Sequence, residues 1–239
     1  MTFFFTNWIW IPGASMLTLY TIIYLLEWKH PRLQLNHIHH SKLHWLQGMG
    51  FVLLNIGSSY VMATYLQNIS TYFAGVIGFL NVPYWAKFII SFLLLDVLIY
   101  TWHRLNHIFP GLWKAHELHH QEKELNIFST FHFAPQEILY STVWKSIIYP
   151  ALGILPEAFF LYNAVFFLVI LFHHSNYKMS HVWDKIVSAI IVTPGLHHLH
   201  HSVILKESNS NYGSVFSFWD RIFQSMTRYE QQKIKYGVK

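Results

Sequence analysis

Long runs of apolar residues, separated by short polar segments, dominate the pattern along this chain of 239 residues. A helix needs about 20 apolar residues to cross a bilayer, with a range of about 17–25. Five runs approach the crossing length: Trp8 to Leu26, Leu46 to Leu66, Ala86 to Trp102, Ile138 to Leu155 and Ala158 to Phe172. A sixth apolar run, 73–80, is too short to cross, and we expect it to be re-entrant or interfacial. We therefore predict an all-α, integral-membrane helical bundle of about four to five spans.

Basic residues suggest which way this bundle faces. They gather after the first, third and fifth apolar runs, and Lys87 is the exception on the other side. If the N-terminus lies outside and the spans alternate, these basic segments share one side, which the positive-inside rule assigns to the cytoplasm. Every cluster of histidines lies in those segments or at the adjoining helix ends. We thus expect a cytosolic, histidine-rich cap on the membrane bundle.

Composition supports the membrane interpretation. The chain has 53% hydrophobic, 18% aromatic and 11% charged residues, against roughly 25% charged in soluble proteins. The alternative, a soluble protein with a very apolar core, would have to bury five long apolar runs in one domain of this size. The formal charge of +5 comes without a long basic run, so we expect no nucleic-acid partner. No repeat or linker divides residues 1–239, which we treat as a single domain.

The 18 histidines and the absence of cysteine direct attention to an imidazole metal site. His103 and His107 stand at i and i+4, on one face of a helix. In the pattern His-x-x-His-His the first histidine faces both later ones, whereas the adjacent pair diverges by about 100°. Such a pair can serve two neighbouring metals. The pattern occurs at residues 116–120 and again at 197–201. The predicted ligands are His103, His107, His116, His119, His120, His174, His197, His200 and His201.

Nine imidazoles exceed what one metal takes, since a metal usually has four to six ligands, so we predict two metals. The third group, at residues 173–176, leaves open whether His173 or His174 is the ligand. His30 and His132 are read as ordinary interfacial residues. The cluster His37, His39, His40 and His44 is also read mainly as a polar loop, although its i, i+4 pair could bind metal peripherally.

A carboxylate within a membrane span is costly and usually functional, which singles out Asp96. It precedes His103 by two helical turns and shares its face with Tyr100, so it could accept the second N–H of a ligand histidine. Its alternative role is a polar contact between helices. Asn176 is a further supporting candidate. Asp184 and Asp220 are weaker ones, and each follows a tryptophan that favours the alternative role of anchoring a helix at the interface. Glu137 is a weaker candidate.

These residues together resemble the fatty acid hydroxylase superfamily, also called the sterol desaturase family, of the bacterial type. The resemblance covers about 93–226 and rests on the histidine arrays together with shorter motifs. These motifs are Glu124-Leu-Asn126, Phe172-His-His-Ser-Asn176, Thr193-Pro-Gly195, Asn211-Tyr-Gly213 and Trp219-Asp-Arg-Ile-Phe223. The chain departs from the family pattern at His132 and Ala134 and at Gln224-Ser225, none of which is an expected ligand. The family pattern favours His174 over His173.

The resemblance implies a di-iron centre and dioxygen-dependent hydroxylation or desaturation of a lipid: a fatty acyl, sphingoid, sterol, carotenoid or alkyl-glycerol chain. It also implies a separate electron donor, such as a ferredoxin or a b-type cytochrome with its reductase. The bacterial type of the family further implies a location in the bacterial inner membrane. The ligands alone do not choose iron, because zinc fits imidazoles equally well and could replace it during purification. Two other functions therefore stay open: a zinc-dependent membrane lipid hydrolase, and a histidine-rich metal transporter or sensor. Transport would need polar ligands through the depth of the bilayer, where Asp96 is the one carboxylate.

Overall fold

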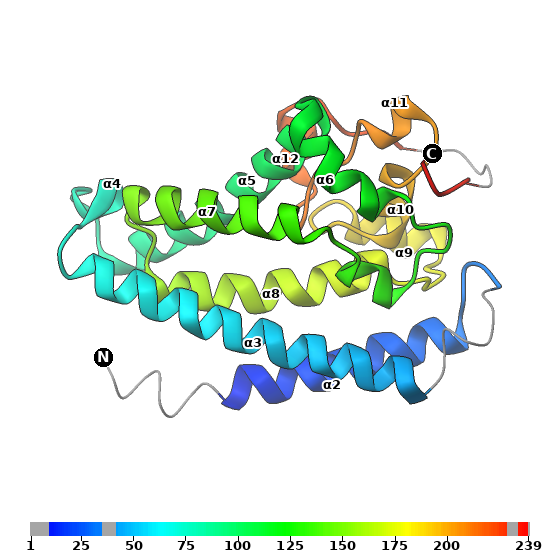
Figure 1. Cartoon of the computed structure of the whole chain (residues 1–239), viewed down its shortest axis with the longest axis horizontal. Helices are drawn as coiled ribbons and strands as arrows, with labels where there is room; N and C mark the ends of the chain where they lie inside the picture. Colours follow the sequence, from blue (N-terminus) through cyan, green and yellow to red (C-terminus); the bar gives the residue numbers. More distant parts are fainter. Residues whose placement is uncertain (1–9, 35–41, 229–233, 239) are drawn as a thin grey trace.

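The computed structural model describes residues 10–34, 42–228 and 234–238. Five long helices lie along the longest axis of the molecule (Figure 1). Short helices and loops gather at one end of them, beside the C-terminus. The long helices are α2 (Trp10–Lys29), α3 (Lys42–Ser70), α5 (Tyr84–Ile108), α7 (Pro135–Leu152) and α8 (Pro156–His174). The described residues contain no strand, so the all-α prediction is confirmed for them.

The short elements are distributed unevenly between the two ends of the bundle. One short helix, α4 (Gly75–Gly78), caps the end remote from the histidines (Figure 1). It contains part of the apolar run that is too short to cross a membrane. The opposite end carries α6 (Pro110–His120), η2 (Ile127–Phe131), α9 (His181–Val187), α10 (Pro194–His200), α11 (Leu205–Ser208) and α12 (Phe218–Ile222).

Local sequence sets most of the helix ends. Proline stands in the first turn of α6, α7, α8 and α10. A backbone N–H at this position has no partner within the helix, so its absence in proline costs no hydrogen bond. The side chain of Asn126 caps η2 by accepting from the N–H of Phe128 at 2.8 Å. Helix α7 ends at Gly153, whose φ of +74° suits glycine. A Cβ there would lie 2.2 Å from the carbonyl oxygen of Ala74, so glycine also allows α4 to touch this turn.

Helix α8 is the central element, because it packs against α2, α3, α5, α10 and η2. One buried cluster joins it to α3, α5 and α7 through Leu66, Leu95, Tyr149 and Tyr162. A second cluster joins it to α2 and η2 through Tyr20, Ile127, Phe167 and Leu171. The C-terminus of α8 is thereby fixed from several sides at the histidine-rich end of the bundle.

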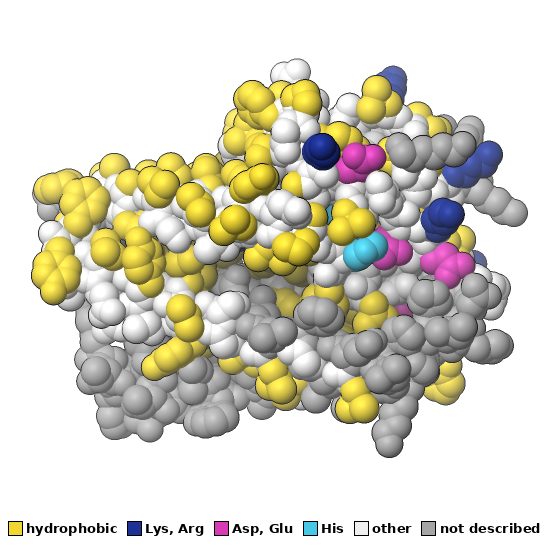
Figure 2. All heavy atoms as spheres, viewed as in Figure 1, with side chains coloured by type: hydrophobic (Ala, Val, Ile, Leu, Met, Phe, Trp, Pro, Cys, Tyr) yellow, Lys and Arg dark blue, Asp and Glu magenta, His cyan; other side chains and the backbone are white. Residues whose placement is uncertain are grey.

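Each of the five predicted spans coincides with a long helix. Within the described ranges, two of these helices, Tyr84–Ile108 and Pro156–His174, are long and apolar enough to cross a membrane. The count of four to five spans stays a prediction. In Figure 2, apolar side chains cover the face over α4 and α7, and charged side chains gather at the end that holds the short helices. Exposed apolar residues on α7 include Ile138, Val143 and Ile147, and Phe79 directly follows α4.

Candidate metal centre

Four helix ends converge at the histidine-rich end of the bundle. The last turns of α5 carry His103 and His107, and α6 carries His116, His119 and His120. Helix α8 ends at His174. Helix α10 and the residue that caps it carry His197, His200 and His201. Tertiary packing thus gathers imidazoles from four elements into one region of the molecule.

The nine predicted ligands divide into two groups of converging nitrogen atoms. Within each group, one ligand nitrogen per residue lies within 4.8 Å of every other. The five-histidine group is His103, His107, His116, His120 and His200. The four-histidine group is His119, His174, His197 and His201. Each His-x-x-His-His array contributes to both groups, as the divergence of adjacent side chains requires.

Hydrogen bonds to Nδ1 determine where the ring lone pair points in several of these residues. His103 and His200 approach the carbonyl oxygens of Tyr212 and Ser210, at 3.0 and 2.7 Å. The carbonyl oxygen of Ile170 lies 2.8 Å from Nδ1 of His174. Since a carbonyl oxygen can only accept, Nδ1 carries the proton in all three residues, and Nε2 carries the lone pair. These are the tautomers that metal ligation through Nε2 requires.

Carboxylate and amide oxygens hold two more ligands from behind. Oε1 of Glu137 lies 2.8 Å from Nδ1 of His116, and Oδ1 of Asn209 lies 3.3 Å from Nδ1 of His107. Glu137 also accepts from the side-chain amide of Asn106 at 3.4 Å. A carboxylate behind a ligand histidine orients the ring and raises its basicity. Glu137, a weaker candidate in the sequence, thus occupies the position that we expected Asp96 to fill.

In the four-histidine group the Nε2 atoms face one another. The distances are 3.1 Å between His119 and His174, 3.0 Å between His174 and His197, and 3.1 Å between His197 and His201. A neutral imidazole has one donor nitrogen, so four rings cannot satisfy all these contacts when Nδ1 of His174 already holds the proton. A cation shared by the four lone pairs would satisfy them. Residues of this chain therefore fit a metal.

The five-histidine group passes the same test. Nε2 of His107 and Nε2 of His200 are buried without a hydrogen-bond partner. A buried nitrogen without a partner costs free energy unless something occupies the space in front of it. Burial, followed by neighbouring histidines, lowers the pKa of His120 and His200 well below its usual range. Burial and neighbouring histidines also lower the pKa of His119, His197 and His201 well below its usual range. These rings are therefore neutral and can ligate.

His173 and His198 are buried histidines outside both groups. The ring of His173 stacks on that of His197, with centroids 3.9 Å apart and planes at 24°. Of the adjacent pair at the end of α8, His174 is the one whose nitrogen joins the four-histidine group. Nε2 of His198 donates to the carbonyl oxygen of Ser175 at 3.1 Å, and its Nδ1 lies 2.9 Å from the hydroxyl of Tyr236. His198 therefore ties two chain segments together.

Asp96 is fully buried, and none of its hydrogen-bond partners among the described residues is a histidine. Its carboxylate accepts from the hydroxyl of Tyr162 at 2.7 Å and from the indole N–H of Trp219 at 2.8 Å. It also accepts from the backbone N–H groups of Val215 and Phe216, at 3.3 and 3.1 Å. These contacts match the alternative role, a polar contact between elements, and they fix the segment before α12 against α5 and α8.

Tyr100, on the same face, belongs to a chain of hydroxyl contacts. Its hydroxyl lies 2.7 Å from Oγ of Ser225, which donates to Oδ1 of Asp220 at 2.7 Å. Asp220 in turn accepts from the backbone N–H groups of Tyr212 and Gly213, both at 2.8 Å. The carbonyl of Tyr212 holds His103, so Asp220 supports a predicted ligand through one residue. Burial raises the pKa of Asp220 above its usual value, because it outweighs the opposite effect of the hydrogen bonds from Ser225, Gly213 and Tyr212.

The remaining supporting candidates contact backbone rather than a histidine. Asn176 pairs with the backbone N–H and carbonyl of Leu33, at 2.9 and 2.7 Å. The carboxylate of Asp184 lies against Gly195, where a Cβ would be 2.6 Å from either oxygen. A larger residue in place of Gly195, at the start of α10, would therefore push the carboxylate of Asp184 aside.

The departures from the family pattern have local explanations. Gln224 has a φ of +55°, a conformation that favours glycine. The hydroxyl of Ser225 connects Tyr100 to Asp220. Exposed His132 forms an ion pair with Glu122. Ala134 precedes the first turn of α7. Residues His37, His39 and His40 lie outside the described ranges, and the side chain of His44 is not among those described.

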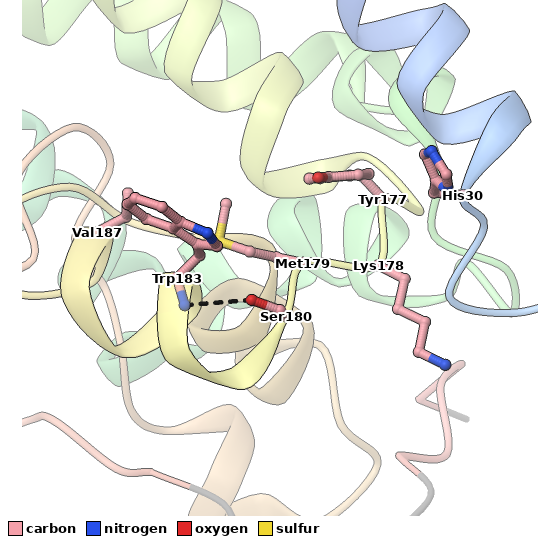
Figure 3. A pocket seen from close by; sticks show the side chains of 7 residues that line it. All are labelled: His30, Tyr177, Lys178, Met179, Ser180, Trp183 and Val187. Atoms are coloured by element: carbon pink, nitrogen blue, oxygen red, sulfur yellow. Dashed lines mark hydrogen bonds between the residues drawn. The ribbon is translucent and has the colours of Figure 1, made fainter.

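Two features near the centre were not anticipated from the sequence. Phe133 stacks on His119 with centroids 4.4 Å apart, and Glu27, on α2, is fully buried. A signal for Glu27 was available, since it is a carboxylate directly after an apolar run, whereas Asp96 lies within one. A surface hollow of about 460 Å³ lies nearby (Figure 3), lined by residues that include His30, Lys178 and Trp183. Lys178 extends away from Trp183 in this view, and the hollow contains none of the nine histidines.

Comparison with known proteins gives a consistent result. A family model described as fatty acid hydroxylase matches residues 88–225. An ornithine lipid hydroxylase of Rhizobium tropici is 33% identical over 124 residues, or 52% of this chain and 37% of that protein. Human alkylglycerol monooxygenase is 25% identical over 62% of this chain and 32% of its own length. Human cholesterol 25-hydroxylase is 26% identical over 56% of this chain and 48% of its own. The chain spans less than half of each relative, and no solved structure matches it.

Proposed function

The chain belongs to the fatty acid hydroxylase family, and from that premise we propose that it is a membrane-bound, di-iron oxygenase. It would use dioxygen to oxidise a C–H bond of a lipid. The observation that carries the proposal is the division of nine imidazoles into two converging groups. Five and four nitrogen ligands are suitable numbers for two neighbouring metals.

The two groups define which residues would hold each metal. His103, His107, His116, His120 and His200 would bind one ion, and His119, His174, His197 and His201 the other. When bound, a pair of iron ions would supply the redox chemistry that dioxygen activation and cleavage of an unactivated C–H bond require, which zinc does not offer. Carbonyls behind the rings and Glu137 would keep the Nε2 lone pairs pointing inward.

The protein surroundings suit a lipid substrate. The nine histidines belong to α5, α6, α8, α10 and the residue that caps α10, at the end of the bundle that holds the short helices. Charged side chains gather on the surface of that end (Figure 2). We propose that a lipid tail reaches the centre from the bilayer around α5 and α8, while the histidine end faces the cytoplasm. Burial of the imidazoles would exclude bulk water from the reacting carbon.

Hydroxylation is favoured over desaturation as the outcome. The three relatives compared are named as an ornithine lipid hydroxylase, an alkylglycerol monooxygenase and a cholesterol 25-hydroxylase, and none is named as a desaturase. These lipids differ widely, so the names support a lipid substrate without selecting one. A separate electron donor, a ferredoxin or a b-type cytochrome with its reductase, would complete the reaction.

Metal content is the decisive measurement. We expect about two irons per chain in detergent-purified protein expressed with iron, and loss of both in a His120→Ala, His201→Ala variant, which removes one ligand from each group. A His132→Ala, His181→Ala variant is the matched control, because both histidines are exposed. It should retain the irons.

Dioxygen consumption then separates the enzymatic alternatives. The iron-loaded protein, given reductant and a lipid extract, should consume dioxygen and yield lipids heavier by one oxygen atom. Lipid cleavage without dioxygen uptake would instead establish the zinc hydrolase. Folded wild-type protein that binds no metal under any loading condition would overturn the di-metal proposal.

A further inference from the structure

We infer that Glu27 is a positioning residue for the four-histidine group, although it lies on α2, outside residues 88–225 that match the family model. This inference rests on the proposed di-metal function. Its carboxylate is fully buried at the end of an apolar helix, at the same end of the bundle as the histidines (Figure 1). It joins α2 to two segments that contact the four-histidine group.

The first segment is the C-terminus of α8. Oε2 of Glu27 accepts from the backbone N–H of Asn176 at 2.8 Å. That N–H belongs to the same peptide unit as the carbonyl of Ser175, which accepts from Nε2 of His198 at 3.1 Å. Both polar groups of this peptide are therefore held, one from α2 and one from α10. His174 lies immediately before this peptide, so the last turn of α8 cannot move without breaking one of these bonds.

The second segment is η2. The same oxygen of Glu27 accepts from the backbone N–H of Ile127 at 2.9 Å. The chain leaves η2 toward Phe133, whose ring stacks on that of His119 at 4.4 Å. One carboxylate oxygen therefore bridges the segments next to His174 and His119, whose Nε2 atoms are 3.1 Å apart.

Neighbouring contacts extend this junction along the chain. The backbone N–H of Arg32 donates to the carbonyl of Asn176 at 2.7 Å, and that of Lys178 donates to the carbonyl of His30 at 2.8 Å. Residues 30–33 and 176–178 thus run side by side. Glu27, one helical turn before residue 30, adds a buried carboxylate to this junction through its contact with Asn176.

Stability alone is a poor explanation for a carboxylate in this place. Oε1 of Glu27 is buried with no hydrogen-bond partner among the described residues. Burying a carboxylate that is only half satisfied is costly, and an apolar side chain of similar size would pack there at lower cost. A single acceptor that two N–H groups share does fix the separation of their segments. That geometric role is what His119 and His174 need to reach the same metal.

The test compares Glu27→Leu, which removes both acceptors, with Glu27→Gln, which keeps one carbonyl oxygen. The control is Glu157→Gln, a carboxylate in the first turn at the opposite end of α8. For each detergent-purified, folded protein, we would measure metal equivalents after loading with Co(II), the visible spectrum of the cobalt, and amide exchange at 126–128 and 175–177 in metal-free protein.

We expect Glu27→Leu to lose about one of about two equivalents, with the affinity of that site lowered about tenfold or more. The cobalt bands of the four-nitrogen site should fade while those of the other site stay, and both amide segments should exchange faster. Glu27→Gln should be intermediate and Glu157→Gln unchanged. If Glu27→Leu does not fold, Glu27→Gln carries the test.

The outcomes separate the inference from the function beneath it. Wild-type protein that binds no metal overturns the proposed function, and the inference with it. Wild-type protein that binds two metals, with Glu27 variants that retain both at wild-type affinity or lose both to the same degree, overturns the inference alone. A selective loss of the metal at the four-histidine group supports it, because a general loss of stability would not divide the two sites, and a selective loss at the five-histidine group overturns it.

Discussion

The carboxylate of Glu137, on α7, lies 2.8 Å from Nδ1 of His116, on α6. It is the one direct contact between a carboxylate and a predicted ligand histidine that the described residues contain. Both side chains are buried, so the contact acts in a medium of low dielectric constant, where it holds the ring strongly. Helix α7 thereby contacts the proposed metal centre without supplying a predicted ligand.

Replacing Glu137 with glutamine should weaken metal binding by the five-histidine group about 10–100-fold, because the ring of His116 would lose its charged partner. Competition with a chelator of known affinity measures this change. The neighbouring exposed residue supplies the control, Gln136→Ala, which should bind as the wild type does. Equal affinities in the Glu137→Gln and Gln136→Ala variants would show that the contact does not support the metal.

Asp96 should matter for stability more than for metal affinity. An Asp96→Ala variant would leave two side-chain donors and two backbone N–H groups without their acceptor, at a cost of about 3 kcal/mol or more. Thermal unfolding in detergent, followed by circular dichroism, measures the loss. Thr101→Val on the same helix removes only a local bond to the carbonyl of Val97 and should change stability little.

If Asp96 instead acts on the metals, the variant would lose metal while its unfolding temperature stays near that of the wild type. That result would restore the role that the sequence suggested for it. The structure places the carboxylate against Tyr162 and Trp219, so we expect the opposite pattern.

The C-terminal segment 234–238 should be held over the centre by Tyr236. Its hydroxyl lies 2.9 Å from Nδ1 of His198, while the N–H of Val238 donates to the carbonyl of His120 at 3.1 Å. Removing the hydroxyl in Tyr236→Phe should cost about 1 kcal/mol and speed amide exchange in this segment. Tyr72→Phe, at an 89% exposed tyrosine, is the control. Unchanged exchange in the segment would mean that the hydroxyl does not retain it.

The absence of cysteine makes the orientation easy to test. Single cysteines at Asn81 and Lys206 would mark the two ends of the molecule, since both residues are exposed. With the histidine end in the cytoplasm, a membrane-impermeant maleimide should label Asn81→Cys in intact spheroplasts. It should label Lys206→Cys only after permeabilisation. The reverse pattern would invert the orientation, and labelling of both in intact spheroplasts would contradict a membrane-spanning bundle.

Much of the fold could be predicted from local pattern. Each apolar run near crossing length became a long helix, because its length and composition leave few polar groups to break it. It could also be predicted that the two adjacent histidines of each His-x-x-His-His array belong to different groups, since adjacent residues of a helix point about 100° apart. His119 and His120 follow this rule, and so do His200 and His201. Whether the two groups bind metal stays a prediction.

The partners behind the ligands could not be predicted in the same way. Asp96 and Glu137 are both carboxylates on apolar helices, and spacing along the chain favoured Asp96. What decided between them is the packing of α7 beside α6, a contact between segments that sequence periodicity does not encode. Glu27 was missed for a related reason, because its partners lie 100 and 149 residues away along the chain.

Long apolar helices, and imidazole arrays whose members diverge in pairs, can be read from the order of residues along the chain. Those properties follow from short-range geometry and from residue chemistry, which act whatever the rest of the chain does. The packing of the helices selected which array member faces which, and which oxygen stands behind each ring. It also decided that α2 reaches the centre through Glu27. Such choices depend on how helices distant in sequence pack, where small differences in many weak contacts select one arrangement.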